Sequence, residues 1–123
     1  MMRIRRVYDG PVADGSRSVL IDRLWPRGVQ KSALRHDAWL KDVAPSPDLR
    51  RWFNHDPAKW AEFRRRYRHE LRVDRDALTP LLDAAAAGDL TLLFAARDAD
   101  HNHAIVLKEY LEELLAGRGA CET

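Results

Sequence analysis

The sequence predicts a small α/β domain, with a three- or four-stranded, mostly parallel sheet flanked by four or five helices. Two unbroken apolar runs, residues 18–21 and 90–96, are typical of strands buried on both faces of a parallel sheet. Amphipathic segments that can cover both faces of the sheet separate these runs. The length of 123 residues fits one domain. We expect that domain to span residues 1–116 and residues 117–123 to form a disordered tail.

The remaining strands are less regular than the two apolar runs. Residues 3–8 are expected to form an edge strand, because arginines interrupt their apolar side chains. Only about eight residues connect this strand to the run at 18–21, which is short for a parallel crossover, so its direction is left open. Residues 38–43 are compatible with a short strand or with an irregular segment.

Helix starts are well marked in the middle of the chain. Ser46 followed by Pro47 has the pattern of a capping residue and a first helical position, and Asp56-Pro57 repeats it. The helix after Asp56 carries one apolar stripe, made by Trp60, Phe63, Tyr67 and Leu71. A third helix is expected over residues 74–87. There Pro80 indicates either a start at Thr79 or a first turn that lacks one hydrogen bond. The last helix is expected over residues 102–116.

Charge is distributed unevenly along the chain, although the formal net charge is only +2. Residues 1–72 carry 17 Lys and Arg against 9 Asp and Glu, whereas residues 73–123 carry 4 against 10. A basic half favours an anionic ligand, because its field concentrates anions. The alternative is that the two halves pair with each other.

The most informative pattern is that both apolar runs end in charged side chains. Residues 22–27 follow the first run, and Arg97-Asp98 follows the second, shortly before a helix start at Asn102-His103. Ligands of open parallel sheets bind beyond the carboxyl ends of the strands, and a helix N-terminus there favours an anion. The sequence therefore predicts a cleft for a small anion such as a phosphate or nucleotide, with ligand-binding candidates Arg23, Trp25, Arg27, Arg97 and Asn102.

Each of these residues also has a purely structural interpretation, and both stay open. Asp22 and Arg23 are also compatible with a salt bridge that ties the loop to the sheet, Trp25 with a core position, and Arg27 with binding loop carbonyls. Asn102 is equally a helix cap, and His103 equally a packing residue at the helix start. If the protein is an enzyme, His103 is the best general acid or base, with Asp22 or Asp98 to orient or assist it.

No metal or cofactor is expected. His101 and His103 are two residues apart and do not share a helix face, and no cysteine or carboxylate cluster completes a site. The sequence contains neither a glycine-rich phosphate loop nor a nucleophile elbow. Reaction class and oligomeric state are left open.

Two other functions remain as alternatives. The helix carrying residues 64–72 has an arginine-rich face that could bind nucleic acid, although a solvated helix face has the same pattern. A non-catalytic interaction module is the second alternative. A single cysteine, no long apolar run and no signal-peptide pattern lead us to expect a cytoplasmic protein without a membrane segment.

Several motifs resemble one family over about residues 4–115. They are Arg6-Val7-Tyr8-Asp9, Asp22-Arg23-Leu24-Trp25-Pro26-Arg27-Gly28, Ala44-Pro45-Ser46, the segments 49–55, 60–67 and 90–96, and Asn102-His103-Ala104. The chain resembles the YeaO-like family, a branch of the domain-of-unknown-function group number four-eight-eight.

The resemblance implies a small bacterial α/β protein without an agreed activity. It adds Ser46 to the candidate ligand-binding residues, since the recurrent polar positions of the family match Asp22, Arg23, Trp25, Arg27, Ser46 and His103. Members of the broader group often have Cys-His-Arg where this chain has Asn102-His103-Ala104, so cysteine chemistry does not carry over. Some members bear a transcription-regulator label, but nothing in this sequence resembles a helix-turn-helix reading head.

Overall fold

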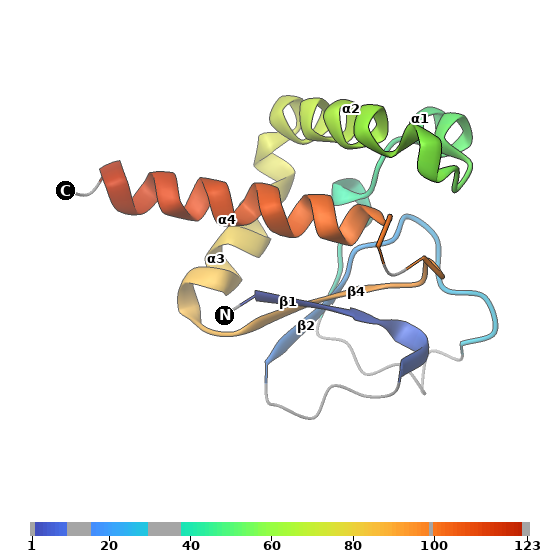
Figure 1. Cartoon of the computed structure of the whole chain (residues 1–123). Coiled ribbons are helices and arrows are strands. Elements are labelled where there is room, and N and C mark those ends of the chain that lie inside the picture. Colours follow the sequence, from blue (N-terminus) through green and yellow to red (C-terminus); the bar gives the residue numbers. More distant parts are fainter. Residues whose placement is uncertain (1, 10–15, 30–37, 99, 122–123) are drawn as a thin grey trace.

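The computed structural model describes residues 2–9, 16–29, 38–98 and 100–121, and a four-stranded parallel sheet lies at its centre (Figure 1). The strand order is β1-β4-β2-β3, and every pair of neighbouring strands is parallel. The strands are β1 (Met2–Arg6), β2 (Arg17–Leu20), β3 (Ala38–Trp39) and β4 (Leu90–Phe94). The predicted α/β class with a small parallel sheet is confirmed.

The direction of the first strand, which the sequence leaves open, is parallel to β4. Strand β1 lies at one edge of the sheet, as predicted, and β2 lies on the other side of β4. Because β1 and β2 are both parallel to β4, they are also parallel to each other. Strand β1 is shorter than expected, because residues 7–9 form a 3-10 turn.

The four α-helices begin close to the predicted positions. They are α1 (Pro47–Phe53), α2 (Trp60–Val73), α3 (Thr79–Ala87) and α4 (His103–Cys121). The Ser46 hydroxyl caps α1 by accepting a hydrogen bond from the amide of Leu49. A 3-10 turn over residues 75–78 precedes α3, so Pro80 lies in the first turn, where no backbone hydrogen bond is lost.

Helix α4 extends to Cys121, five residues beyond the predicted end at Ala116. The predicted tail, residues 117–123, therefore overlaps the last turns of this helix. Residues 122 and 123 lie outside the described part of the chain.

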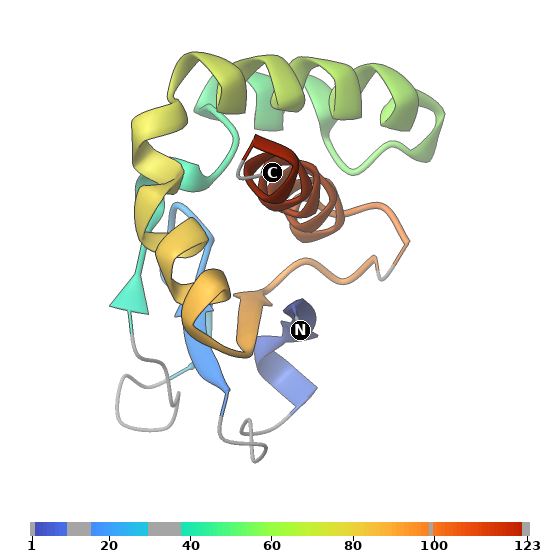
Figure 2. The ribbon, with the colours of Figure 1, turned by 90° about the vertical axis from the view of Figure 1, so that its left-hand side faces the viewer.

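The molecule is layered, with α4 lying on the sheet and α2 lying on α4 (Figure 2). All four helices contribute to one core cluster, which includes Val19, Leu92 and Phe94 from the sheet and Ile21 just after β2. The opposite face is covered differently, by Trp25 and other loop side chains packed on a small cluster of Val7, Leu20 and Leu93. No α-helix of the described part of the chain contributes to this second cluster, so the expected covering of both faces by helices is not found there.

Candidate functional site

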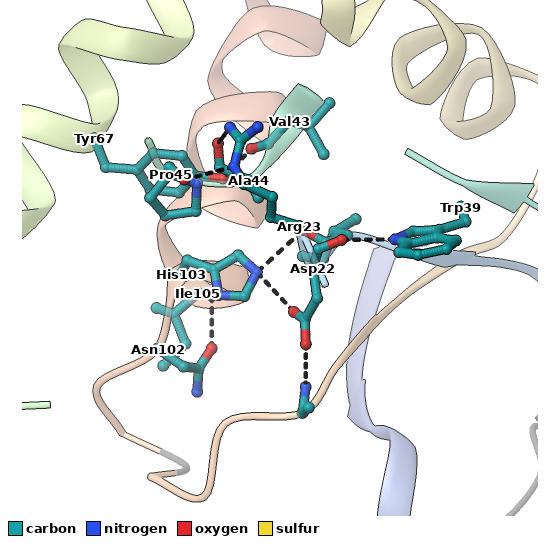
Figure 3. A network of polar contacts seen from close by, with 12 residues as sticks. Asp22, Arg23, Trp39, Val43, Ala44, Pro45, Tyr67, Asn102, His103 and Ile105 are labelled. Atoms are coloured by element: carbon teal, nitrogen blue, oxygen red, sulfur yellow. Dashed lines mark hydrogen bonds and ion pairs between the residues drawn. The ribbon is translucent and has the colours of Figure 1, made fainter. Parts of the chain in front are cut away.

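Strands β2 and β4 end side by side, so the polar residues that follow them meet. Leu20 is aligned with Leu93 in the sheet, and the Ala95 amide donates a hydrogen bond of 3.0 Å to Asp22 Oδ2. The first residue of α4, His103, lies over the same point, with its Nε2 atom 3.2 Å from the Ile21 carbonyl oxygen (Figure 3). The convergence predicted from the two strand ends is therefore present.

Asp22 and His103 form a nearly buried pair at the base of this region. His103 Nε2 lies 3.1 Å from Asp22 Oδ1, and the two side chains are 14% and 15% exposed. The His103 imidazole forms its hydrogen bond with the Ile21 carbonyl. Asp22 Oδ1 lies close to the same ring but has no hydrogen-bond partner among the described residues.

Arg23 points away from Asp22 and ties the loop to another segment. Its guanidinium lies 3.4 Å from the carbonyl oxygens of both Ala44 and Pro45, which are long hydrogen bonds (Figure 3). Asp22 and Arg23 thus make separate connections, and neither serves as the other's partner in the way a salt bridge would require.

Trp25 and Trp39 join the loop to the sheet on its loop-covered face. The Trp25 indole donates to the Val29 carbonyl at 2.6 Å, and the Trp39 indole donates to the Asp22 carbonyl at 2.7 Å. Their rings meet edge to face at 5.3 Å between centroids. This arrangement matches the core interpretation of Trp25, although the residue also contributes to a cavity wall.

A cleft of about 680 Å³ opens above the strand ends, a volume typical of small-molecule sites. Four arginines line it: Arg23, Arg27, Arg50 and Arg97. The last three are exposed, and their guanidinium groups make no hydrogen bond or ion pair with other described residues. The Tyr8 hydroxyl donates 2.8 Å to the Arg27 carbonyl, which positions that loop. The cleft therefore presents several uncompensated positive charges.

The two aspartates of the cleft are held by other partners. Asp22 binds Ala95 and His103, as described above. The Asp98 carboxylate accepts hydrogen bonds from the Asp100 and His101 amides at 2.9 and 3.1 Å, and lies 2.9 Å from His101 Nδ1. The Asp100 amide and the His101 imidazole lower the pKa of Asp98.

A second cavity of about 370 Å³ adjoins the first, and five residues line both: Pro45, Arg50, His55, Ala96 and His103. Its remaining wall combines three apolar side chains, Pro47, Phe53 and Phe63, with four polar ones, Arg51, Asn54, His101 and Asn102. The two cavities thus differ in chemistry while forming one continuous depression.

Comparison with known proteins places the chain in a family. The model described as the inactive DUF488-N3 subclade matches residues 1–122. The chain is a YeaO-like member of the DUF488 family. It is 38% identical over 113 residues to the uncharacterized protein YeaO of Escherichia coli K12, an alignment that covers 92% of this chain and 98% of that protein.

Mycobacterial relatives resemble this DUF488 protein to the same degree. Uncharacterized proteins of Mycobacterium tuberculosis H37Rv and Mycobacterium bovis are each 40% identical over 110 residues, covering 89% of this chain and 92% of theirs. No solved structure gives a significant match. The relatives are bacterial and uncharacterized, so their names indicate no activity. The description of the subclade as inactive agrees with the absence of the Cys-His-Arg pattern from this sequence.

The structure brings most of the predicted site residues of this DUF488 protein together. Asp22, Arg23, Trp25, Arg27, Arg97 and His103 line the larger cavity, and Asn102 lines the smaller one. Asn102 is 2% exposed and caps α4, since its Oδ1 accepts from the Ile105 amide and its Nδ2 donates to the Asp98 carbonyl. Whether any of these residues contacts a ligand stays a prediction.

Ser46 is the predicted residue that lies apart from the others. It contributes to neither cavity wall. Its amide and hydroxyl donate to the two oxygens of Glu70, at 2.8 and 2.6 Å, while the hydroxyl accepts from the Leu49 amide at 3.2 Å. Ser46 therefore fastens the start of α1 to α2.

Arg50 and His55 line both cavities, but neither follows a strand, so the pattern of charged strand ends does not predict them as site residues. Arg50 lies on α1, and His55 lies in the turn after it. A usable signal is Asn54, because an asparagine just after a helix often adopts the left-handed conformation that reverses the chain. Asn54 has φ 46° and His55 has φ 54°.

The arginine-rich face of α2 is largely neutralised by glutamates. Arg64 Nε lies 2.9 Å from Glu109 on α4, and Arg68 pairs with Glu113 on the same helix. Arg65 and Arg66 both bind Glu62, and these two hydrogen bonds lower the pKa of Glu62 to about 2. The basic and acidic halves of the chain therefore pair with each other along α2 and α4.

The described residues contain neither a metal-type cluster nor a membrane-spanning helix. None of their His, Cys, Asp and Glu side chains gather in threes as a metal site requires. Among the same residues, no helix is both long and apolar enough to span a bilayer.

Proposed function

We propose that this DUF488 protein binds a small phosphate-bearing ligand in the strand-end cleft and does not transform it. The observation that carries the proposal is the presence of three exposed arginines on the walls of one cleft, Arg27, Arg50 and Arg97, which have no partner among the described residues. Arginine presents a planar fork of donors that matches phosphate oxygens, so three converging side chains favour a polyanion such as a diphosphate.

The contrast with α2 supports this assignment. Four of the five arginines of that helix, all except Arg72, are paired with glutamates. The aspartates in the cleft are committed to His103 and His101. Positive charge thus remains available in the cleft, whereas it is largely compensated on α2. For this reason we favour the cleft over the α2 face, and a small anion over nucleic acid.

Binding without turnover is supported by the chemistry of the lining residues. No serine, threonine, cysteine or lysine lines either cavity in the described part of the chain. The best acid–base candidate, His103, is 14% exposed and its Nε2 faces Asp22 and the Ile21 carbonyl. In this proposal Asp22 and His103 position the two strand ends rather than act in catalysis.

Isothermal titration with pyrophosphate tests the proposal. We expect measurable binding that weakens as salt is raised, because the ligand displaces counterions from exposed arginines. Each of Arg27→Gln, Arg50→Gln and Arg97→Gln should weaken binding by about tenfold, since a hydrogen bond to a charged group contributes about 1.5 kcal/mol or more.

Arg65→Gln is the matched control, because its side chain is 74% exposed and already bound to Glu62. The proposal is wrong if pyrophosphate does not bind, or if Arg65→Gln weakens binding as much as the cleft variants do. Turnover of a phosphate ester that is lost in His103→Asn would instead establish an enzyme.

A further inference from the structure

The two adjoining cavities suggest a ligand with two chemically different parts. The larger cavity carries the exposed Arg27 and Arg97, whereas the smaller carries Phe53 and Phe63. Arg50 lies on the wall of both, and the arginine that lines only the smaller cavity, Arg51, is bound to Asp48. We infer that the ligand is a nucleoside phosphate, with its phosphates on the arginines of the larger cavity and its base in the smaller one. This inference rests on the proposed function and adds the class of ligand.

The floor of the smaller cavity is suited to a flat ring. Phe53 and Phe63 are 6% and 2% exposed, and their rings stack at 4.2 Å between centroids with an interplanar angle of 24°. Two prolines, Pro45 and Pro47, add rigid apolar surface. A volume of about 370 Å³ lies in the range of small-molecule pockets and accommodates a heterocycle together with a sugar.

The same cavity has polar groups at its edge, which a purely apolar ligand would leave unsatisfied. Asn102 is 2% exposed, and its amide uses one donor for the Asp98 carbonyl and one acceptor position for the Ile105 amide. An asparagine amide has two donors and two lone pairs, so one of each remains. A base edge with a neighbouring donor and acceptor matches that pair.

The turn after α1 presents two further polar side chains at this cavity. Asn54 and His55 both have positive φ, a costly backbone conformation for residues other than glycine. The Asn54 amide donates to the Arg50 carbonyl at 3.0 Å, and the Asp56 amide donates to the Phe53 carbonyl at 3.0 Å, so local hydrogen bonds hold the turn. This geometry places Asn54 on the smaller cavity and His55 on both.

Titration with four probes separates the parts of the ligand: adenosine diphosphate, pyrophosphate, adenosine and isopentenyl diphosphate. We expect adenosine diphosphate to bind about tenfold or more tightly than pyrophosphate, because the base adds stacking and hydrogen bonds. Adenosine should bind weakly, since it lacks the charged group. Guanosine, cytidine and uridine diphosphates then rank the bases.

The outcomes distinguish this inference from the proposed function. Equal affinity for pyrophosphate and adenosine diphosphate would overturn the inference while leaving phosphate binding intact. Isopentenyl diphosphate binding more tightly than every nucleotide would also overturn it, and would assign an aliphatic ligand to the smaller cavity. Failure of all phosphates to bind would remove both proposals together.

Two variants provide a matched pair, because Asn54 lines only the smaller cavity and Arg97 only the larger one. Asn54→Gly keeps the fold, since glycine adopts positive φ without strain. We expect it to weaken adenosine diphosphate binding by about fivefold while leaving pyrophosphate unchanged. Arg97→Gln should weaken both ligands alike. An Asn54→Gly variant that binds both diphosphates as the parent does, or a parallel loss in both, would contradict the inference.

Discussion

The Ser46→Ala variant separates a structural from a ligand-binding role for a residue that the family resemblance places in the site. In the structure the Ser46 hydroxyl donates to Glu70 at 2.6 Å and accepts from the Leu49 amide at 3.2 Å. The variant removes both hydrogen bonds. It keeps the backbone contact between the Ser46 amide and Glu70, which measures 2.8 Å.

The magnitude follows from these two contacts. Loss of a helix N-cap hydroxyl costs about 1 kcal/mol of unfolding free energy. The lost bond to the Glu70 carboxylate contributes about 1 kcal/mol more, at the low end for a charged acceptor, because Glu70 is half-buried and water can replace the hydroxyl. We therefore expect a total of about 2 kcal/mol, or roughly 6–10 °C in Tm for a domain of this size.

Urea and thermal denaturation measure this change, and pyrophosphate titration measures the ligand affinity. We expect a lower midpoint with an unchanged m-value, and an unchanged affinity, because Ser46 lines neither cavity. Ser46→Thr, which keeps the hydroxyl, should retain most of the stability. If Ser46→Ala loses affinity while its stability stays at the parent level, the structural assignment is wrong and Ser46 is a ligand contact.

Three further variants test other features of the structure. Burial raises the pKa of the Tyr67 phenol well above its ordinary value. The folded state therefore retains a proton that the unfolded state releases at alkaline pH, so the free energy of unfolding should fall as the pH rises above about 10. Tyr67→Phe should show a shallower alkaline fall in urea denaturation, after losing about 1 kcal/mol at neutral pH with its bond to the Val43 carbonyl. His55→Gly should raise the unfolding free energy by about 0.5–1 kcal/mol, because the backbone strain removed at the positive φ exceeds the entropic cost of glycine. A lower Tm than the parent protein would refute this. A double-mutant cycle on Arg64 and Glu109 should give a coupling below about 1 kcal/mol that shrinks with salt, and a larger, salt-insensitive value would contradict a solvent-exposed pair.

Local patterns were enough to predict most of the fold. The apolar runs of β2 and β4 and the Ser46-Pro47 cap depend on neighbouring residues, so the sequence alone reveals them. The direction of β1 depends instead on pairing with β4, which lies more than eighty residues away in the chain. The one-sided packing of the helices was also beyond local reasoning, because it follows from the order in which the strands enter the sheet.

The candidate site was predictable in part for the same reason. The strand-end rule brings Asp22 and Arg97 together because both directly follow parallel neighbours. The rule says nothing about Arg50 and His55, which reach the cleft only because α1 packs against α2 and α2 against α4. Nor could it separate Ser46, whose side chain is committed to Glu70, from residues that face the cleft.

The distribution of charge partners links the loop motif of residues 22–28 to the proposed anion site. Asp22 and Arg23 are bound within the protein, Asp22 to Ala95 and His103, and Arg23 to the carbonyls that precede Ser46. Had the Asp22 carboxylate at the cleft wall lacked these partners, it would have been free to pair with a neighbouring guanidinium and so to weaken the proposed anion binding. The Asp22 carboxylate is turned toward His103 instead. Arg27, at the end of the same short loop, therefore keeps its charge uncompensated by other described residues. The internal bonds of Asp22 are therefore a condition for the positive potential of the cleft.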